Sequence, residues 1–153
     1  MEKIKSFTIN HDKLLPGLYV SRVDGDVITY DVRMKRPNKG DYLSTGEAHT
    51  IEHLFATYVR NSIYGKDVIY CGPMGCRTGF YLLMRNNVSK DDVIRLVQDS
   101  MRFIAGYKGD IPGASRIECG NYLDQDLKGA QRVCKKMIDV LKHWKDDDMK
   151  YEE

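Results

Sequence analysis

The sequence of 153 residues contains no apolar run long enough to cross a bilayer, and residues 1–6 lack the apolar core of a signal peptide. A spanning helix needs about 20 mostly apolar residues. The charge shows no marked excess either, with 24 basic against 22 acidic side chains, and no basic stripe interleaved with aromatics could follow a phosphate backbone. We therefore expect a soluble cytoplasmic protein that binds neither membrane nor nucleic acid.

Cysteine is scarce, and the four present could at most form two disulfides: Cys71, Cys76, Cys119 and Cys134. In a reducing compartment such thiols more often act as ligands, nucleophiles or buried apolar groups. No internal repeat is present, and 153 residues suffice for one hydrophobic core. We expect residues 1–153 to form a single domain.

The pattern of apolar residues predicts an α+β fold in which an antiparallel sheet packs against helices. Strands rich in β-branched and aromatic residues are expected at 18–23, 27–33, 68–70 and 80–84, with a further strand before His11. Asp24-Gly25-Asp26 between the first two predicts a hairpin turn. Helical periodicity is found from Ser44 to near Gly65, from 89 to about 105, and from about 126 to 144. Ser44 and Glu47 have the spacing of a capping box, which predicts the start of the first helix. Residues 106–120 are expected to be irregular, and residues 145–153 to form a frayed acidic tail.

The first helix carries the most informative pattern in the chain, His49-Thr50-Ile51-Glu52-His53. Residues four apart lie on one helix face, so both imidazoles can reach one metal ion with Glu52 beside them. The apolar residues Ile51, Leu54 and Phe55 face the other way, so the motif does not face the core. Two nitrogens do not hold a catalytic ion, so the pattern requires a third ligand and an open position.

Cys119 is the preferred third ligand because it lies between two expected elements and precedes a glycine that permits close backbone approach. Cys134 falls on the apolar stripe of the last helix, and Cys71 ends a short strand, so both are expected to be packed thiols. Cys71 and Cys76 do not have the C-x-x-C spacing of a redox pair.

Cys76 lies in a glycine-containing loop and is followed by Arg77, a cation that favours the thiolate form. The residue is either a reactive thiol or a loop cysteine without a role, and the local sequence does not separate the two. Two histidines on a polar helix face are likewise common on solvated surfaces. His11 and His143 add nothing to the metal pattern by their positions.

Three segments in this order resemble one family, the S-ribosylhomocysteine lyases or LuxS family. The segments are His49-Thr50-Ile51-Glu52-His53-Leu54, Pro73-Met74-Gly75-Cys76-Arg77-Thr78-Gly79-Phe80-Tyr81 and Glu118-Cys119-Gly120. Shorter similarities occur at Ser6-Phe7, at His11-Asp12 and around Asp31-Val32-Arg33 and Pro37-Asn38-Lys39. The resemblance extends from Ser6 to about the last helix.

The resemblance implies a homodimer of α+β subunits, each with one divalent metal ion. The ion is expected to be Fe²⁺, replaceable by Zn²⁺ or Co²⁺, with His49, His53 and Cys119 as ligands. Members of the family cleave S-ribosylhomocysteine to homocysteine and 4,5-dihydroxy-2,3-pentanedione, the precursor of autoinducer-2. The resemblance therefore links this chain to homocysteine metabolism and to signalling between cells.

The resemblance also assigns roles to five further residues. Glu52 and Cys76 match acid-base groups, while Ser6, His11 and Arg33 match residues of a substrate site that both subunits build. Two bases suit the chemistry, since the sugar carbonyl must migrate along the chain before the thioether can be eliminated. Arg33 is expected either to pair with the substrate carboxylate or to support the Cys76 thiolate.

Tyr70 departs from the family pattern, which has an acidic residue six positions before the reactive cysteine. If that carboxylate tunes a base or orients Arg33, its absence would alter the pH profile of an otherwise active enzyme. Two alternatives to a lyase remain open at this point. One is a metallopeptidase in which Glu52 activates water. The other is a non-catalytic module whose metal is a structural staple, for example with Cys76 as a fourth ligand.

Overall fold

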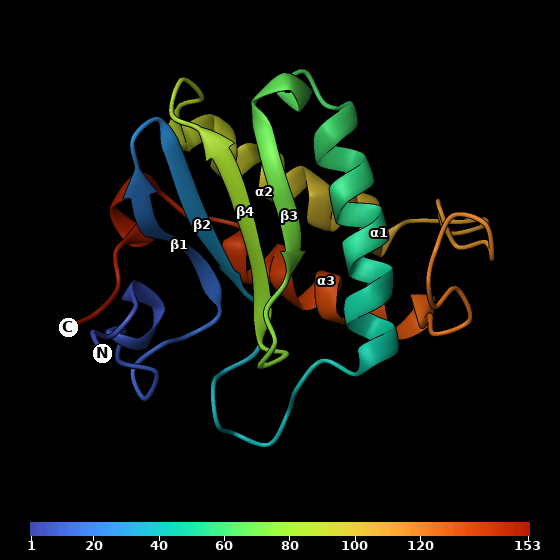
Figure 1. Ribbon diagram of the computed structural model, residues 1–153, viewed down its shortest axis with the longest axis horizontal. Coiled ribbons are helices and arrows are strands. Elements are labelled where there is room, and N and C mark those ends of the chain that lie inside the picture. Colours follow the sequence, from blue (N-terminus) through green and yellow to red (C-terminus); the bar gives the residue numbers. More distant parts are fainter.

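The computed structural model describes all residues 1–153 and contains a four-stranded antiparallel sheet with three α-helices against one face (Figure 1). The strands are β1 (Gly17–Asp24), β2 (Val27–Arg33), β3 (Val68–Pro73) and β4 (Gly79–Arg85), in the order β1-β2-β4-β3. One continuous apolar core joins the sheet to all three helices. The predicted single-domain α+β architecture is thus confirmed.

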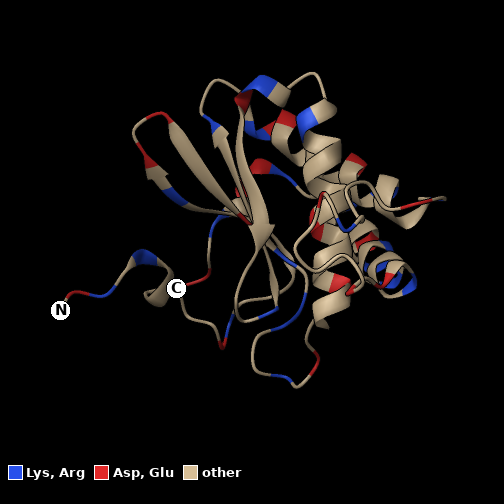
Figure 2. Ribbon diagram, turned by 45° about the vertical axis from the view of Figure 1, so that its right-hand side comes forward, with Lys and Arg blue, Asp and Glu red and all other residues tan.

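A glycine turn joins β1 to β2, and side chains along β2 alternate between the two faces of the sheet. Gly25 turns the hairpin with φ of +59°, a conformation that favours glycine. Along β2, Tyr30 and Val32 enter the core, so Asp31 and Arg33 point to the opposite face of the sheet. Figure 2 shows few charged residues in the strands and many along helices and loops. Asp31 and Arg33 are exceptions, and both are buried.

The helix α1 (Thr45–Asn61) begins at the capping box that the sequence predicts. The backbone N–H of Glu47 donates to Ser44 Oγ at 3.1 Å, and the N–H of Ser44 donates to Glu47 Oε1 at 2.8 Å. Leu54 and Phe55 are fully buried against the sheet, whereas His49 and His53 are half-buried. The helix therefore presents its metal motif away from the core, as predicted.

The helices α2 (Lys90–Ala105) and α3 (Leu127–Leu141) complete the layer, and Cys134 is buried on α3 as expected. α3 ends three residues before the predicted end at Trp144. The reason is a long-range contact, because Trp144 Nε1 donates to the carbonyl oxygen of Leu18 at 2.8 Å and draws the chain across β1. None of the helices combines the length and hydropathy needed to cross a membrane.

The predicted strand before His11 is wrong. Residues Lys5–Phe7 instead form one turn of 3-10 helix, and the chain then continues through turns to β1. The carbonyl oxygen of Lys5 accepts from both the backbone N–H and the hydroxyl of Thr8, at 3.0 and 2.7 Å. A hydroxyl that bonds to nearby backbone competes with strand pairing, which explains the error.

The frayed tail expected at residues 145–153 is packed in the structure. Asp146–Met149 forms a 3-10 turn, and Met149 lies in the core at 1% exposure. The hydroxyl of Tyr151 donates to Asp31 Oδ2 at 2.7 Å, and Lys13 Nζ donates to the carbonyl oxygen of Glu153. The acidic composition predicted an exposed segment, but Met149 packs into the core and Tyr151 bonds to strand β2. The C-terminus therefore lies against the N-terminal segment near β1 (Figure 1).

We expect Gly17→Ala to lower the free energy of unfolding by about 1–3 kcal/mol, because the added methyl group would overlap the indole ring of Trp144. The matched control is Gly106→Ala, whose methyl group would meet only the Arg102 carbonyl oxygen at an ordinary 3.5 Å. Denaturant unfolding of both variants makes the comparison. Equal midpoints would show that Trp144 does not pack closely on β1 in solution.

Candidate metal and thiol sites

His49, His53 and Cys119 converge in the structure although 66 residues separate the second histidine from the cysteine. Cys119 Sγ lies 3.3 Å from His49 Nε2 and 3.9 Å from His53 Nε2. The two imidazole rings are nearly perpendicular, with centroids 4.6 Å apart. The sequence-predicted ligands are therefore brought together as one group of donor atoms.

Backbone carbonyl groups fix the orientation of both imidazoles. His49 Nδ1 lies 2.8 Å from the carbonyl oxygen of Asp124, and His53 Nδ1 lies 2.7 Å from that of Pro112. A carbonyl oxygen only accepts, so these contacts favour the neutral tautomer with the proton on Nδ1 and the lone pair on Nε2. The amide nitrogen of Gln125 also lies 3.2 Å from His49 Nδ1. Both free lone pairs belong to the nitrogens nearest Cys119, which is the arrangement that metal-binding histidines require.

Thr50 anchors the loop that supplies the first of these carbonyls. The residue is fully buried, and its hydroxyl donates to Gln125 Oε1 at 2.7 Å while accepting from the backbone N–H of Asp126 at 2.9 Å. Thr50 follows His49 directly in α1, so the loop is fixed at the level of the metal motif. This contact places the Asp124 carbonyl against His49.

Local turns place Cys119 and the second carbonyl. The backbone N–H of Cys119 donates to the carbonyl oxygen of Ser115 at 2.9 Å, and the hydroxyl of Ser115 donates to Glu118 Oε2 at 2.6 Å. Gly113 has φ of +72°, and a Cβ there would lie 3.3 Å from His53 Nδ1. Glycine thus allows residues 112–113 to approach the imidazole closely.

The three donor groups fit a divalent transition metal ion. Bond lengths of about 2.0–2.3 Å to nitrogen and sulfur at a tetrahedral centre place neighbouring donors about 3.5 Å apart. The observed sulfur–nitrogen separations of 3.3 and 3.9 Å bracket that value. Two imidazoles and a thiolate suit zinc, iron or cobalt better than magnesium or calcium. Cys76 is absent from the group, so the chain supplies three ligands and leaves a position open.

Glu52 lies on α1 between the two histidines in sequence and is half-buried. It is not among the clustered donors. Burial raises the pKa of Cys71 to about 12, and the Glu52 carboxylate adds to this increase. Glu52 is thus close enough to β3 to act on Cys71 electrostatically, on the strand that leads to Cys76.

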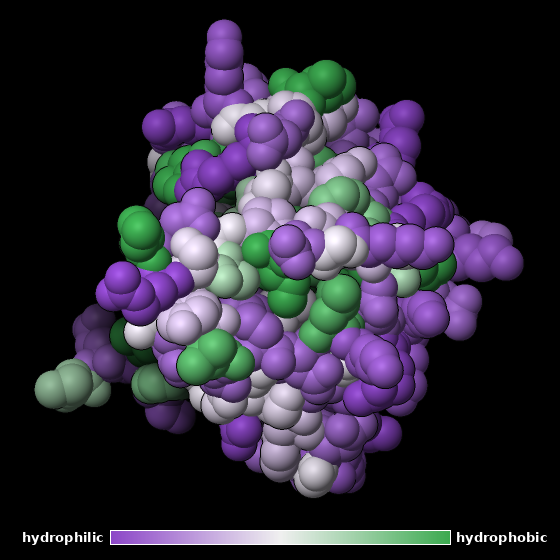
Figure 3. All heavy atoms as spheres, turned by 90° about the vertical axis from the view of Figure 1, so that its right-hand side faces the viewer, coloured by the Kyte–Doolittle hydropathy of each residue, from purple (hydrophilic) through white to green (hydrophobic).

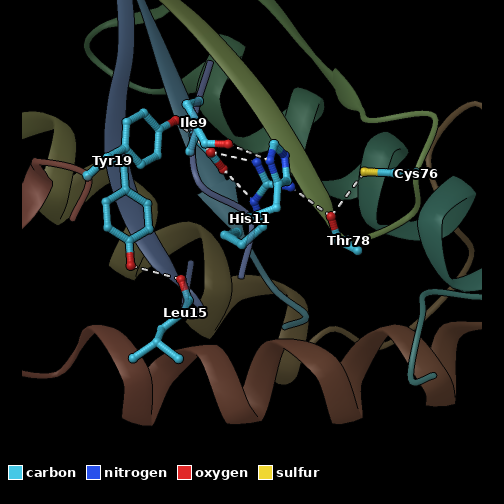
Figure 4. A network of polar contacts seen from close by, with 9 residues as sticks. Ile9, His11, Leu15, Tyr19, Cys76 and Thr78 are labelled. Atoms are coloured by element: carbon cyan, nitrogen blue, oxygen red, sulfur yellow. Dashed lines mark hydrogen bonds and ion pairs between the residues drawn. The ribbon is translucent and has the colours of Figure 1, made fainter. Parts of the chain in front are cut away.

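Cys76 is exposed in the turn between β3 and β4, and its Sγ lies 3.1 Å from the hydroxyl oxygen of Thr78 (Figure 4). Thr78 is buried and accepts a hydrogen bond from Arg33 Nη1 at 2.8 Å. Arg77, the cation next to Cys76 in sequence, is exposed. The cation joined to the thiol is therefore Arg33, and sequence reasoning missed Thr78 as the link.

Arg33 is held by Asp31 in a bidentate ion pair, with Nε to Oδ1 at 3.1 Å and Nη2 to Oδ2 at 2.7 Å. The two side chains are 2% and 0% exposed. With these nitrogens engaged and Nη1 directed at Thr78, little of Arg33 faces solvent. Of the two expected roles for Arg33, burial favours support of Cys76 over direct contact with a substrate carboxylate.

His11 and Cys76 line one cavity of about 290 Å³ together with Tyr42 and Thr78. His11 Nδ1 lies 2.9 Å from the carbonyl oxygen of Ile9, as Figure 4 shows beside the Cys76–Thr78 contact. Ser6 instead lines a different cavity of about 270 Å³, together with Tyr70 and Tyr81. The structure thus brings His11 to Cys76 and places Ser6 outside that cavity.

The other two cysteines have the inert character that the sequence predicts. All four cysteines are free thiols. Burial raises the pKa values of Cys71 and Cys134 to about 12, so both remain protonated at neutral pH. Cys76 is thus the one exposed thiol in the chain.

Tyr70, which replaces the acidic residue of the family pattern, is half-exposed, and its ring lies over Gly72. The structure shows that Asp31 orients Arg33 without a carboxylate at position 70. One of the two functions considered for the missing carboxylate is therefore provided by another residue. An effect on the pH profile stays a prediction.

The metal ligands and the Cys76 cavity form two separate clusters that share no hydrogen bond. In the view of Figure 1, the β3–β4 turn lies at the lower end of the sheet, and the orange loop with Cys119 lies beyond α1. The molecular face on the α1 side is largely hydrophilic with small, separate hydrophobic areas (Figure 3).

Comparison with known proteins agrees with this site. The family model described as S-Ribosylhomocysteinase (LuxS) matches residues 4–148. The chain is 48% identical to the S-ribosylhomocysteine lyase of Clostridium acetobutylicum over the full length of both proteins. It is 50% identical to that of Clostridium beijerinckii over 92% of each, and 46% identical to that of Phocaeicola vulgatus over 99% of this chain and 98% of the relative. The chain belongs to the S-ribosylhomocysteinase (LuxS) family.

Proposed function

We propose that this protein cleaves S-ribosylhomocysteine to homocysteine and the autoinducer-2 precursor, with a divalent metal ion at His49, His53 and Cys119. The convergence of two oriented imidazoles and one sulfur carries the proposal. The alternatives have lost support. The family is not a peptidase family, and Cys76 does not complete a closed structural site within the chain.

The metal is proposed to be Fe²⁺, with Zn²⁺ and Co²⁺ as substitutes, since all three accept nitrogen and sulfur donors. When bound, a divalent ion in this position acts as a Lewis acid toward sugar oxygens and lowers the energy of negative charge that develops nearby. The protein contributes the orientation of the ligands. The Asp124 and Pro112 carbonyls keep both Nε2 lone pairs directed at the same point.

Cys76 and Glu52 are proposed to move the protons. The sugar carbonyl migrates when a base removes a proton from one carbon and returns a proton to its neighbour. After the carbonyl has reached the position β to the thioether, removal of one more proton expels homocysteine thiolate, which then takes up a proton. Cys76 is exposed and receives polar support from Thr78, as a base on carbon requires. Glu52 beside the metal ligands suits transfers at oxygen.

His11 and Ser6 are proposed to position the substrate. His11 lines the cavity next to Cys76, where its Nε2 is left for a substrate oxygen because Nδ1 faces the Ile9 carbonyl. Ser6 lines a second cavity on the N-terminal turn, where its hydroxyl is proposed to bind another part of the substrate. Arg33 is proposed to act through Thr78 on the thiol.

We further propose that the protein is a homodimer in which Cys76 and His11 of one subunit work with the metal ion of the other. The separation of the two clusters within one chain supports this arrangement. Each cluster is also open to approach, because Cys76 is exposed and the metal ligands are only half-buried. In a two-fold dimer both composite sites form from the same surface pair.

The first test is release of free thiol from S-ribosylhomocysteine by the metal-loaded protein. We expect Cys76→Ala and Glu52→Gln each to lower kcat/KM by about 10²–10⁴-fold, the usual effect of removing a general acid or base. The control is Cys134→Ala, which removes the same side chain from the core of α3 and should retain turnover. Full turnover by both site variants would refute the proposed mechanism.

The second test concerns the metal. Cys119→Ala should weaken metal affinity by roughly 100-fold or more, since even loss of a group that orients a ligand costs 10- to 100-fold. Cys76→Ala should retain about one ion per chain, because three ligands remain. Elemental analysis after anaerobic purification and dialysis measures the metal content of both variants and identifies the metal. Chelation should abolish thiol release, and added Fe²⁺ should restore it; equal metal loss in both variants would favour a four-ligand structural site.

The third test asks whether the two clusters meet across a dimer. Cys119→Ala and Cys76→Ala proteins, each inactive, are mixed under conditions that exchange subunits, and light scattering gives the oligomeric state. Mixed dimers then contain one intact composite site, so random exchange should restore about one quarter of wild-type activity. Mixing Cys119→Ala with His49→Ala serves as control, because both lack the metal half. No recovery in the first mixture would place both halves of the site within one subunit.

A further inference from the structure

We propose that Tyr151 is a positioning residue for Cys76, acting from the C-terminal segment through Asp31, Arg33 and Thr78. This inference rests on the proposed role of Cys76 in proton transfer. Tyr151 lies outside residues 4–148, the part of the chain that the family model matches. The role is therefore assigned by this structure alone.

The connection is continuous and consists of short polar contacts on the face of the sheet opposite the helices. Tyr151 Oη donates to Asp31 Oδ2 at 2.7 Å, and Asp31 holds Arg33 through both carboxylate oxygens. Arg33 Nη1 then donates to Thr78 Oγ1 at 2.8 Å, and Thr78 Oγ1 lies 3.1 Å from Cys76 Sγ. Four hydrogen-bonded steps thus lead from the last residues of the chain to the exposed thiol.

The donors and acceptors along this path have a defined direction. Arg33 only donates, so Thr78 Oγ1 accepts from it and keeps its own proton for another partner. The sulfur of Cys76 is the partner within reach. A hydroxyl that donates to sulfur while accepting from a guanidinium stabilises the thiolate over the thiol. The effect requires that Arg33 Nη1 stay directed at Thr78.

Tyr151 controls that direction because it occupies one oxygen of Asp31. Without its hydroxyl, Oδ2 would lose a donor, and the buried carboxylate would be satisfied by Arg33 alone. The ionisable groups around Asp31 are Arg33, Tyr151, Tyr19 and Tyr81. Burial and the adjacent Asp31 charge raise the pKa of Tyr151, so its hydroxyl remains a donor throughout the neutral range.

The position of Tyr151 is itself fixed by packing. Its ring stacks on Tyr19 with centroids 5.1 Å apart and an interplanar angle of 22°. Tyr19 also contacts Trp144 edge to face, and its hydroxyl donates to the carbonyl oxygen of Leu15 at 2.8 Å (Figure 4). The ring alone is therefore expected to keep the tail in place, which makes the hydroxyl separable from the packing. Tyr151→Phe removes only the hydroxyl.

The experiment measures how fast iodoacetamide alkylates Cys76 in the metal-loaded protein at pH 7, with peptide mass spectrometry to score Cys76 separately from the other thiols. Tyr151→Phe should slow this reaction about two- to tenfold, the size expected for loss of one internal hydrogen bond. The matched control, Tyr64→Phe, removes a hydroxyl near the far end of α1 and should react like wild type. In thiol release, kcat of Tyr151→Phe should fall while KM stays within about twofold.

A double-mutant cycle with Thr78→Val distinguishes a connected path from two separate effects. Thr78→Val removes the hydroxyl next to the sulfur and should slow alkylation at least as much as Tyr151→Phe. If Tyr151 acts through Thr78, the double variant should be no slower than Thr78→Val alone. Fully additive effects, or wild-type alkylation by Tyr151→Phe, would overturn the inference. Alkylation does not require turnover, so a protein without lyase activity would refute the proposed function and leave this comparison interpretable.

Discussion

The metal site depends on the hydrogen bonds that tie two imidazole rings of α1 to backbone carbonyls of the loop at residues 106–126. These bonds at 2.8 and 2.7 Å favour one tautomer of each ring, orient each Nε2 toward Cys119 and hold the loop against the helix. They matter more than helical spacing, because residues four apart share a face in any helix. In this protein the two histidines form a binding site because Thr50 and Gly113 allow the loop to lie against α1. Cys119 is then delivered as the third ligand by the same loop.

The thiol cluster depends on a different constraint, the burial of the Asp31–Arg33 ion pair on the face of the sheet without helices. Removing two charges from water is costly, and an apolar pair of similar size is often at least as stable. The pair is therefore poorly explained as a source of stability. The position of the ion pair suggests an orienting role, because Asp31 holds two guanidinium nitrogens of Arg33 and thereby directs the third toward Thr78. The strand register places Asp31 opposite Tyr81 and Arg33 opposite Gly79, so the cation lies beside the turn that carries Cys76.

The sequence predicted those features that depend on local pattern. The hairpin at Gly25, the capping box at Ser44 and the apolar face of α1 each follow from residues a few positions apart, and all three are confirmed. Cys119 was found because a loop cysteine followed by glycine is a plausible ligand. The strand expected before His11 failed for a local reason, the bond from Thr8 to Lys5. The errors at the end of α3 and in the C-terminal tail concern contacts between distant segments. Nothing in the acidic composition of the tail indicates that Tyr151 will bond to Asp31, 120 residues earlier. Backbone carbonyls such as that of Pro112 have no side-chain signature at all.

The regular elements and the irregular segments therefore contribute differently to the two clusters. Sheet and α1 supply residues whose positions follow from the core, namely His49, His53, Arg33 and Asp31. The loop at 106–126 and the C-terminal segment supply the groups that direct them. The C-terminal segment is anchored by Met149 in the core and by an aromatic stack, whereas a few hydrogen bonds hold the loop against α1. Segments with few buried contacts open locally at lower free energy than the core. The orientation of the metal ligands is consequently expected to fail before the fold does, so that activity is lost under milder conditions than those that unfold the sheet.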